Sequence, residues 1–266
     1  MARPTRGATY TKHFDETLRA GVYEAQVPNI EFLYEHSSTI NPEYNIGDRV
    51  LLPDGRVFRY GLMANSGQEC SKGVKFGGTM ADHGIALCSP ASAELVGAKS
   101  FTVANQTFAV DELRGGYCCL YTASSTYQQF GIIGNTAAAA ETVTIYLDHP
   151  MTTALGATNG IEVLPNPYRY MTYINDMDYN CVAGVPVSVP ASGEYFWLQT
   201  WGPIWANPGP YGQGGAAGER ELIWWTDGQL RVYASTYAGM QKAGFLMTRD
   251  ALGTDSPPFF MLQISV

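Results

Sequence analysis

Charged residues are scarce in this chain. Asp, Glu, Lys and Arg make up 15% of its 266 residues, against about 25% in a typical globular domain. A disordered chain combines high charge density with few aromatic residues, and a coiled coil needs a charge-rich helical repeat. The low charge and the 12% of aromatic residues exclude both classes. The formal net charge of -8 argues against nucleic acid as a partner, because phosphate binding requires concentrated positive charge.

Long apolar runs are lacking as well. No run approaches the roughly 20 residues that a helix needs to span a bilayer. The first six residues are not followed by the apolar stretch of a secretory signal peptide. We therefore expect synthesis in the cytoplasm and no membrane partner.

The cysteines form no recognisable framework. Their number is odd, their spacing is irregular and no C-x-x-C pair occurs, so the sequence predicts neither a disulfide set nor a thiolate metal site. We interpret them as buried apolar side chains. They are Cys70, Cys88, Cys118, Cys119 and Cys181.

Motifs of catalysis and of metal or phosphate binding are also missing. The four histidines have no partner at a metal-ligand spacing, and neither G-x-S-x-G nor a Walker A sequence is present. The pairs Asp82-His83 and Asp148-His149 need not touch, because neighbouring residues of a strand point to opposite faces. The sequence thus predicts no enzyme activity, no metal and no cofactor. The sequence leaves one catalytic possibility open: the fold could bring together two carboxylates from distant positions, as in a glycosidase.

Residues 1–44 differ from the remainder. Four of the 16 basic residues fall within the first 19 positions: Arg3, Arg6, Lys12 and Arg19. Prolines and glycine interrupt the segment, while apolar residues spaced by four allow a short helix over residues 13–25. The apolar content is too high for a free tail. We predict an extended N-terminal arm that lies against the body or a neighbour.

Residues 45–266 show the punctuation of strands. Asp54-Gly55 and Asp227-Gly228 each separate two β-prone runs, and Asp-Gly supplies the positive φ of a hairpin turn. Clean alternation of apolar and other residues predicts a strand over residues 142–148, and a second alternating run predicts a last strand over residues 259–266.

Helical candidates in this part are short and few. The best are residues 91–98 and 137–141, both under three turns. We therefore predict an all-β fold: a β-barrel or sandwich-like body of short antiparallel strands over residues 45–266, preceded by the extended arm of residues 1–44. A break near residues 150–167 would divide the body, and the sequence leaves one or two domains open.

Tryptophan and glycine offer two further features. Trp side chains build β cores and subunit interfaces, and exposed ones stack on sugars. We favour core and interface. The Gly-rich residues 207–218 are interpreted as a flexible or interface loop. The tryptophans are Trp197, Trp201, Trp205, Trp224 and Trp225.

Residues 46–60, IGDRVLLPDGRVFRY, resemble segments of tailed-bacteriophage virion proteins of the capsid decoration or cement type. The resemblance lies in the Gly-Asp entry, the Asp-Gly-Arg turn and the aromatic-Arg-Tyr exit, placed after an N-terminal arm. Residues 147–155 and 195–203 show a weaker likeness. Residues 207–218 and the Trp224-Trp225 hairpin do not match the family pattern.

The resemblance implies a structural virion protein without catalysis. Such a decoration (cement) protein binds the phage head and stabilises the shell by bridging capsomers. The implied partners are the major capsid protein and further copies in a homotrimer, on the capsid surface of the virion. The arm residues that we expect to contact the capsid are Arg3, Arg6, Tyr10 and Phe14.

Two alternatives stay open. The first is a tail, baseplate or fibre component of the virion. The second is a carbohydrate-binding or carbohydrate-cleaving β-protein that uses the tryptophans and a carboxylate pair.

Deleting residues 2–40 tests the role of the arm. We expect attachment to capsids to be lost while the body still folds, since the arm is predicted to lie outside the body's core. Cosedimentation with capsids and circular dichroism measure the two properties. Undiminished attachment would contradict the prediction.

Overall fold

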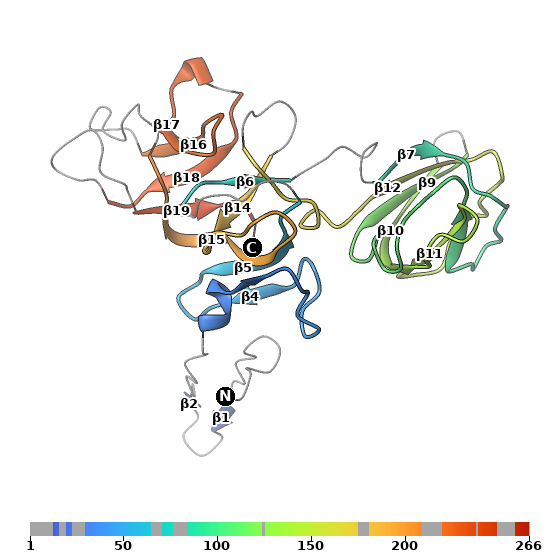
Figure 1. Cartoon of the computed structure of the whole chain (residues 1–266), viewed down its shortest axis with the longest axis horizontal. Helices are drawn as coiled ribbons and strands as arrows, with labels where there is room; N and C mark the ends of the chain where they lie inside the picture. Colours follow the sequence, from blue (N-terminus) through green and yellow to red (C-terminus); the bar gives the residue numbers. More distant parts are fainter. Residues whose placement is uncertain are drawn as a thin grey trace. The chain divides into compact units, whose positions relative to one another are not determined.

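The computed structural model describes residues 13–15, 20–22, 30–64, 71–76, 84–123, 126–174, 181–208, 220–237, 239–248 and 259–265. Its regular structure is nearly all β, which confirms the predicted fold class (Figure 1). Two short 3-10 helices, η1 (Glu31–Tyr34) and η2 (Ser235–Tyr237), are the only helices in this described part. None of them has the length or apolarity of a membrane span.

The chain folds into two compact units. Unit 1 combines Met1–Lys75 with Thr172–Val266, and unit 2 is the intervening segment Phe76–Met171. Unit 2 is thus inserted into unit 1 in sequence. Its second boundary, at residues 171 and 172, falls shortly after the region 150–167 where the sequence suggested a break.

Unit 2 is one curled antiparallel sheet with the strand order β7-β12-β9-β10-β11-β8. Strand β10 pairs first with β9 and then with β11, and a bulge between Ile132 and Gly134 accompanies the change. The bulge bends β10, so the sheet curls into a half-barrel around its own core (Figure 1). The strands are β7 (Ile85–Cys88), β8 (Ser100–Val103), β9 (Tyr117–Ala123), β10 (Thr126–Asn135), β11 (Val143–Leu147) and β12 (Gly160–Leu164).

Unit 1 contains an eleven-stranded sheet whose main path is β13-β6-β14-β15-β19-β18-β16-β17. The long strand β15 connects its parts, because it pairs with β3, β5, β14 and β19 along its length. The strands are β3 (His36–Ser37), β4 (Arg49–Leu51), β5 (Val57–Leu62), β6 (Val74–Lys75), β13 (Thr172–Tyr173), β14 (Val182–Pro186), β15 (Tyr195–Trp205), β16 (Glu221–Trp224), β17 (Leu230–Val232), β18 (Lys242–Leu246) and β19 (Phe259–Gln263).

Both hairpins with an Asp-Gly turn are confirmed. Gly55 has φ +85° between β4 and β5, and Gly228 has φ +78° between β16 and β17. At the first turn the Asp54 carboxylate accepts hydrogen bonds from the Arg56 backbone N–H (3.1 Å) and from its Nε (2.7 Å). At the second, a Cβ on Gly228 would lie 2.7 Å from the carbonyl oxygen of Gly73, so only glycine fits there.

The three predicted helices are wrong. Residues 13–25 contain two paired strands, β1 (His13–Asp15) and β2 (Ala20–Val22). Within 91–98, Glu94 pairs with Leu155 through two backbone hydrogen bonds of 2.8 and 2.9 Å. Within 137–141, Ala140 and Glu141 have positive φ. Segments this short are marginal as helices, and strand pairing prevails, locally in residues 13–25 and with a distant segment at Glu94.

Residues 30–44, which the sequence placed in the arm, pack onto unit 1. Leu33 is only 1% exposed and belongs to a core cluster with Phe58 and Trp197. The ring of Phe32 meets Trp197 edge-on at 5.6 Å, and β3 pairs with β15. A deletion of residues 2–40 would therefore remove part of the core, and the deletion that separates attachment from folding ends at residue 29.

Leu33→Ala tests this packing. We expect it to lower the free energy of unfolding by about 2–5 kcal/mol, because it leaves a cavity against Phe58 and Trp197. Urea denaturation of the full chain measures the loss. Tyr34→Ala, at a side chain that is 51% exposed, is the matched control. Equal effects of the two substitutions would show that η1 is no part of the core.

Candidate functional site

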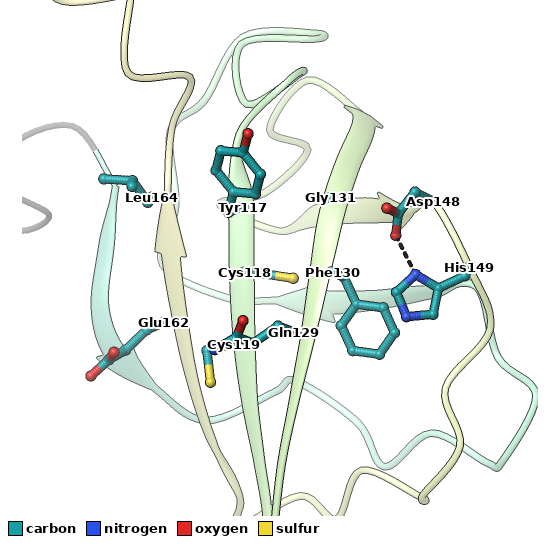
Figure 2. A pocket seen from close by; sticks show the side chains of 10 residues that line it. All are labelled: Tyr117, Cys118, Cys119, Gln129, Phe130, Gly131, Asp148, His149, Glu162 and Leu164. Atoms are coloured by element: carbon teal, nitrogen blue, oxygen red, sulfur yellow. Dashed lines mark hydrogen bonds and ion pairs between the residues drawn. The ribbon is translucent and has the colours of Figure 1, made fainter. Parts of the chain in front are cut away.

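A depression in unit 2 lies on β12, β9 and β10 (Figure 2). Its volume is about 470 Å³. Figure 2 shows Glu162 and Leu164 on one side of β9, and Asp148 with His149 beyond β10 on the other. The lining residues are Tyr117, Cys118, Cys119, Gln129, Phe130, Gly131, Asp148, His149, Glu162 and Leu164.

Strand register places the outward side chains in rows. Glu162 and Gln129 lie opposite Cys119 on its two neighbouring strands, and Leu164 and Gly131 lie opposite Tyr117. Because strand residues alternate between faces, these rows face outward while Cys118 and Phe130 join the core. The register therefore brings a carboxylate, a thiol and an amide side by side.

The pair Asp148-His149 borders the depression just after β11. The Asp148 backbone N–H donates to the Gly131 carbonyl at 3.0 Å, and its Oδ1 lies 2.6 Å from His149 Nδ1. A Cβ on Gly131 would lie 2.8 Å from Asp148 Oδ2, so glycine leaves room for this carboxylate. Asp148 and His149 lie after the end of β11, where neighbouring side chains need not point to opposite faces, so the two can touch. His149 also covers Phe130, with ring centroids 4.5 Å apart.

Tyr121 and Tyr127 extend the outward face beyond the polar row. They lie opposite each other in the register, and their rings meet edge-on at 5.3 Å. The Tyr121 hydroxyl donates a hydrogen bond to Glu162, which raises the pKa of Tyr121 to about 12. Tyr127 is 61% exposed. An aromatic row thus adjoins the row of Glu162, Cys119 and Gln129.

The two cysteines beside the depression are poor nucleophiles. Burial raises the pKa of the Cys118 thiol to about 12. Burial also raises the pKa of Cys119, and the charge of Glu162 adds to this effect. Thiolates are the reactive form, so these environments lower the reactivity of both thiols.

Charge defines which ligands the depression accepts. Its lining includes the carboxyl groups of Asp148 and Glu162 but no Lys or Arg. Such a surface repels phosphate and other anions and offers acceptors to hydroxyl or amine donors. No group of three or more metal-ligating side chains is found within the described residues.

A smaller depression in unit 1, of about 270 Å³, has an aromatic wall. Tyr44, Tyr60 and Trp197 contact one another there, with ring centroids 5.1 to 5.3 Å apart. Burial raises the pKa of Tyr60 to about 12, and the Asn41 N–H donates to its hydroxyl at 3.4 Å. These contacts fasten residues 30–44 to the sheet, so we assign the depression to packing.

An apolar face is the second notable surface of unit 1. Register places Pro203, Met261 and Phe245 in one row across β15, β19 and β18. Trp205 pairs with Phe259 in the next row, and the Met247 N–H donates to the Phe259 carbonyl at 3.0 Å. The exposed fractions are 40% for Trp205, 44% for Phe245, 49% for Met247 and 54% for Phe259. We call this set of six residues the apolar face.

The predicted contact residues of the arm are only partly located. Arg3, Arg6 and Tyr10 lie outside the described residues, and for Phe14 the structure describes the backbone of β1 alone. Residues 209–218 of the Gly-rich segment also lie outside the described part.

The tryptophans divide between core and surface. Trp197 and Trp224 are buried, Trp225 stacks on the Arg231 guanidinium at 4.1 Å, and Trp205 joins the apolar face. The interpretation of the cysteines as buried is confirmed for Cys118 and wrong for Cys181, which is exposed. Cys88 and Cys119 are half-buried, and Cys70 lies outside the described residues.

The outward rows of unit 2 were not found by sequence reasoning. Their members come from three strands and the turn after β11, and no spacing along the chain links them. The sequence carried one usable signal: alternation within β9 and β10, which separates the residues that point inward from those that point outward.

Comparisons with protein-family models, curated proteins and solved structures found no match for this chain.

The cysteine environments predict an order of alkylation. At pH 8 we expect iodoacetamide to modify Cys181 first, Cys119 more slowly and Cys118 last, because a thiol with a pKa of about 12 holds only about 10⁻⁴ of its population as thiolate. Peptide mass spectrometry over time measures the order. The urea-unfolded chain is the control, in which the three sites should react alike. Rapid modification of Cys118 in the folded chain would refute its assigned environment.

Proposed function

We propose that this chain is a structural virion protein: a capsid decoration (cement) protein that binds the phage head and stabilises the shell by bridging capsomers. The observation that carries the proposal is the apolar face of unit 1. Trp, Phe and Met are the residue types enriched at protein interfaces. Folded monomers rarely expose large contiguous apolar patches, so such a face marks an assembly surface.

The edge of the apolar face has the polar character of an interface rim. Glu221 lies opposite Phe245 in the register and forms an ion pair with Lys242. Exposed Gln263 follows Met261 on the same side of β19. An apolar centre bordered by polar groups is the usual anatomy of a specific protein interface.

The virion assignment draws on the resemblance of residues 46–60. In unit 1 this segment is ordered as the β4–β5 hairpin, and β5 pairs with the central strand β15. The resemblance thus concerns an integral part of the unit that carries the apolar face. The proposed partners are the major capsid protein and other copies of the chain in a homotrimer.

Bridging requires two contact surfaces on one chain. The apolar face is the first in this proposal. The second is the basic N-terminal segment, where Arg3, Arg6, Tyr10 and Phe14 stay the predicted capsid contacts. Deletion of residues 2–29 removes the second surface and leaves Leu33 in its core.

The alternatives differ in abundance and chemistry. A tail, baseplate or fibre component would use the same apolar face but would be far scarcer in the particle than the major capsid protein. A carbohydrate site built on tryptophan would use neither Trp197 nor Trp224, because both are buried in the cores.

Charge placed on the apolar face tests the proposal. The double variant Phe245→Lys and Phe259→Lys should weaken binding to capsids that lack the protein by about 100-fold, since buried aromatic anchors contribute most of an interface's affinity. Cosedimentation measures binding, and urea denaturation verifies folding. Tyr117→Lys with Tyr127→Lys, on unit 2, is the matched control.

Two results would overturn the proposal. One is capsid binding that the Phe245 and Phe259 substitutions leave unchanged. The other is a copy number in purified particles far below that of the major capsid protein, measured by quantitative mass spectrometry, which would favour the tail alternative.

A further inference from the structure

We propose that unit 2 binds a neutral saccharide in the depression on the outer face of β12, β9 and β10. This inference is independent of the virion function, because it uses a different unit and different residues. It stands on three observations: the spacing of the tyrosines, the polar row between them and the charge of the lining.

Tyrosines flank the polar row on both sides along the strands. Tyr117 lies before it on β9, and Tyr121 with Tyr127 lies after it. Tyr117 is 57% exposed and Tyr127 is 61% exposed. Tyr117 and Tyr121 are four residues apart, which places them about 13 Å apart along the strand. This span suits a short oligosaccharide, whose C–H faces pack on tyrosine rings while its hydroxyls reach the row between them.

The polar row supplies matched donors and acceptors. Gln129 is exposed, and its amide makes no hydrogen bond within the described residues, so it offers two N–H donors and a carbonyl. Glu162 is held by the Tyr121 hydroxyl and retains further acceptor capacity. Neighbouring sugar hydroxyls both donate and accept hydrogen bonds, and an amide beside a carboxylate provides partners for both.

Asp148 adds a second oriented carboxylate at the far side of β10. His149 lies 2.6 Å from its Oδ1, while its Oδ2 lies above Gly131. Glycine at position 131 leaves room for this carboxylate, because a Cβ there would lie 2.8 Å from Asp148 Oδ2. In the proposed complex, a hydroxyl-bearing ligand of more than one ring reaches from Glu162 across Gln129 toward Asp148.

Charge selects the ligand class. The lining holds no Lys or Arg, which disfavours phosphorylated or sulfated ligands. Basic peptides are the other class that two carboxylates attract. Each carboxylate here already accepts a bond from a neighbour, Tyr121 or His149, and neutral Gln129 lies between them. The surface is thus arranged for hydroxyl recognition more than for cation capture.

The test presents the full chain on beads to an array of neutral oligosaccharides, since multivalent display detects weak single sites. Calorimetry with the strongest binder then quantifies affinity. We expect Gln129→Leu and Tyr117→Ala each to weaken binding about tenfold, as expected for one lost hydrogen bond or one lost stacking surface. Tyr146→Ala, at an exposed tyrosine of β11 outside the lining, should bind like the parent chain.

Salt dependence separates the two ligand classes. Saccharide binding should not change between low and high salt, whereas binding of a basic peptide should fall steeply and be lost in Glu162→Gln. The proposal is overturned if no neutral saccharide binds, if Gln129→Leu and Tyr117→Ala bind the saccharide like the parent, or if only basic peptides bind. The Phe245→Lys and Phe259→Lys variant should retain saccharide binding. A failure of the saccharide proposal can therefore be distinguished from a failure of the proposed virion function.

Discussion

The two cores determine what the sheets present to their surroundings. In unit 2, Cys118 and Phe130 point into the half-barrel. Since successive strand residues alternate between faces, Tyr117, Cys119 and Gln129 point outward. In unit 1, burial of Leu246, Phe260 and Leu262 likewise leaves Phe245, Phe259 and Met261 on the other face. Both candidate surfaces are the outer sides of sheets whose inner sides hold the fold together.

The two outer faces differ in the chemistry they offer. The face in unit 1 is apolar over three strands, and its polar groups stay at the edge. Such a surface gains most from burial against another protein. The face in unit 2 alternates aromatic and polar rows, and its carboxylates are oriented by Tyr121 and His149. In our proposals, one chain combines an assembly surface with a surface for a small hydroxylated ligand.

Local features of the fold were predictable, while features set by distant partners were not. The Asp54-Gly55 and Asp227-Gly228 hairpins follow from a turn that needs positive φ, and strands β11 and β19 follow from their alternation. Residues 91–98 and 137–141 resembled helices, but pairings such as Glu94 with Leu155 prevail over local propensity. The depression in unit 2 escaped prediction because only sheet register places Glu162 and Gln129 beside Cys119, and only a backbone hydrogen bond to Gly131 places Asp148 near them.

The sequence by itself determined the all-β class and its principal turns, because alternation and Asp-Gly chemistry act within a few residues. Tertiary structure alone decided that residues 30–44 belong to a core through Leu33 and that residues 76–171 form an inserted unit. It also decided which aromatic side chains stay outside: Trp197 and Trp224 are buried, whereas Trp205, Tyr117 and Tyr127 are exposed. The physical reason is that burial depends on which strands become neighbours, and neighbours in these sheets are remote along the chain.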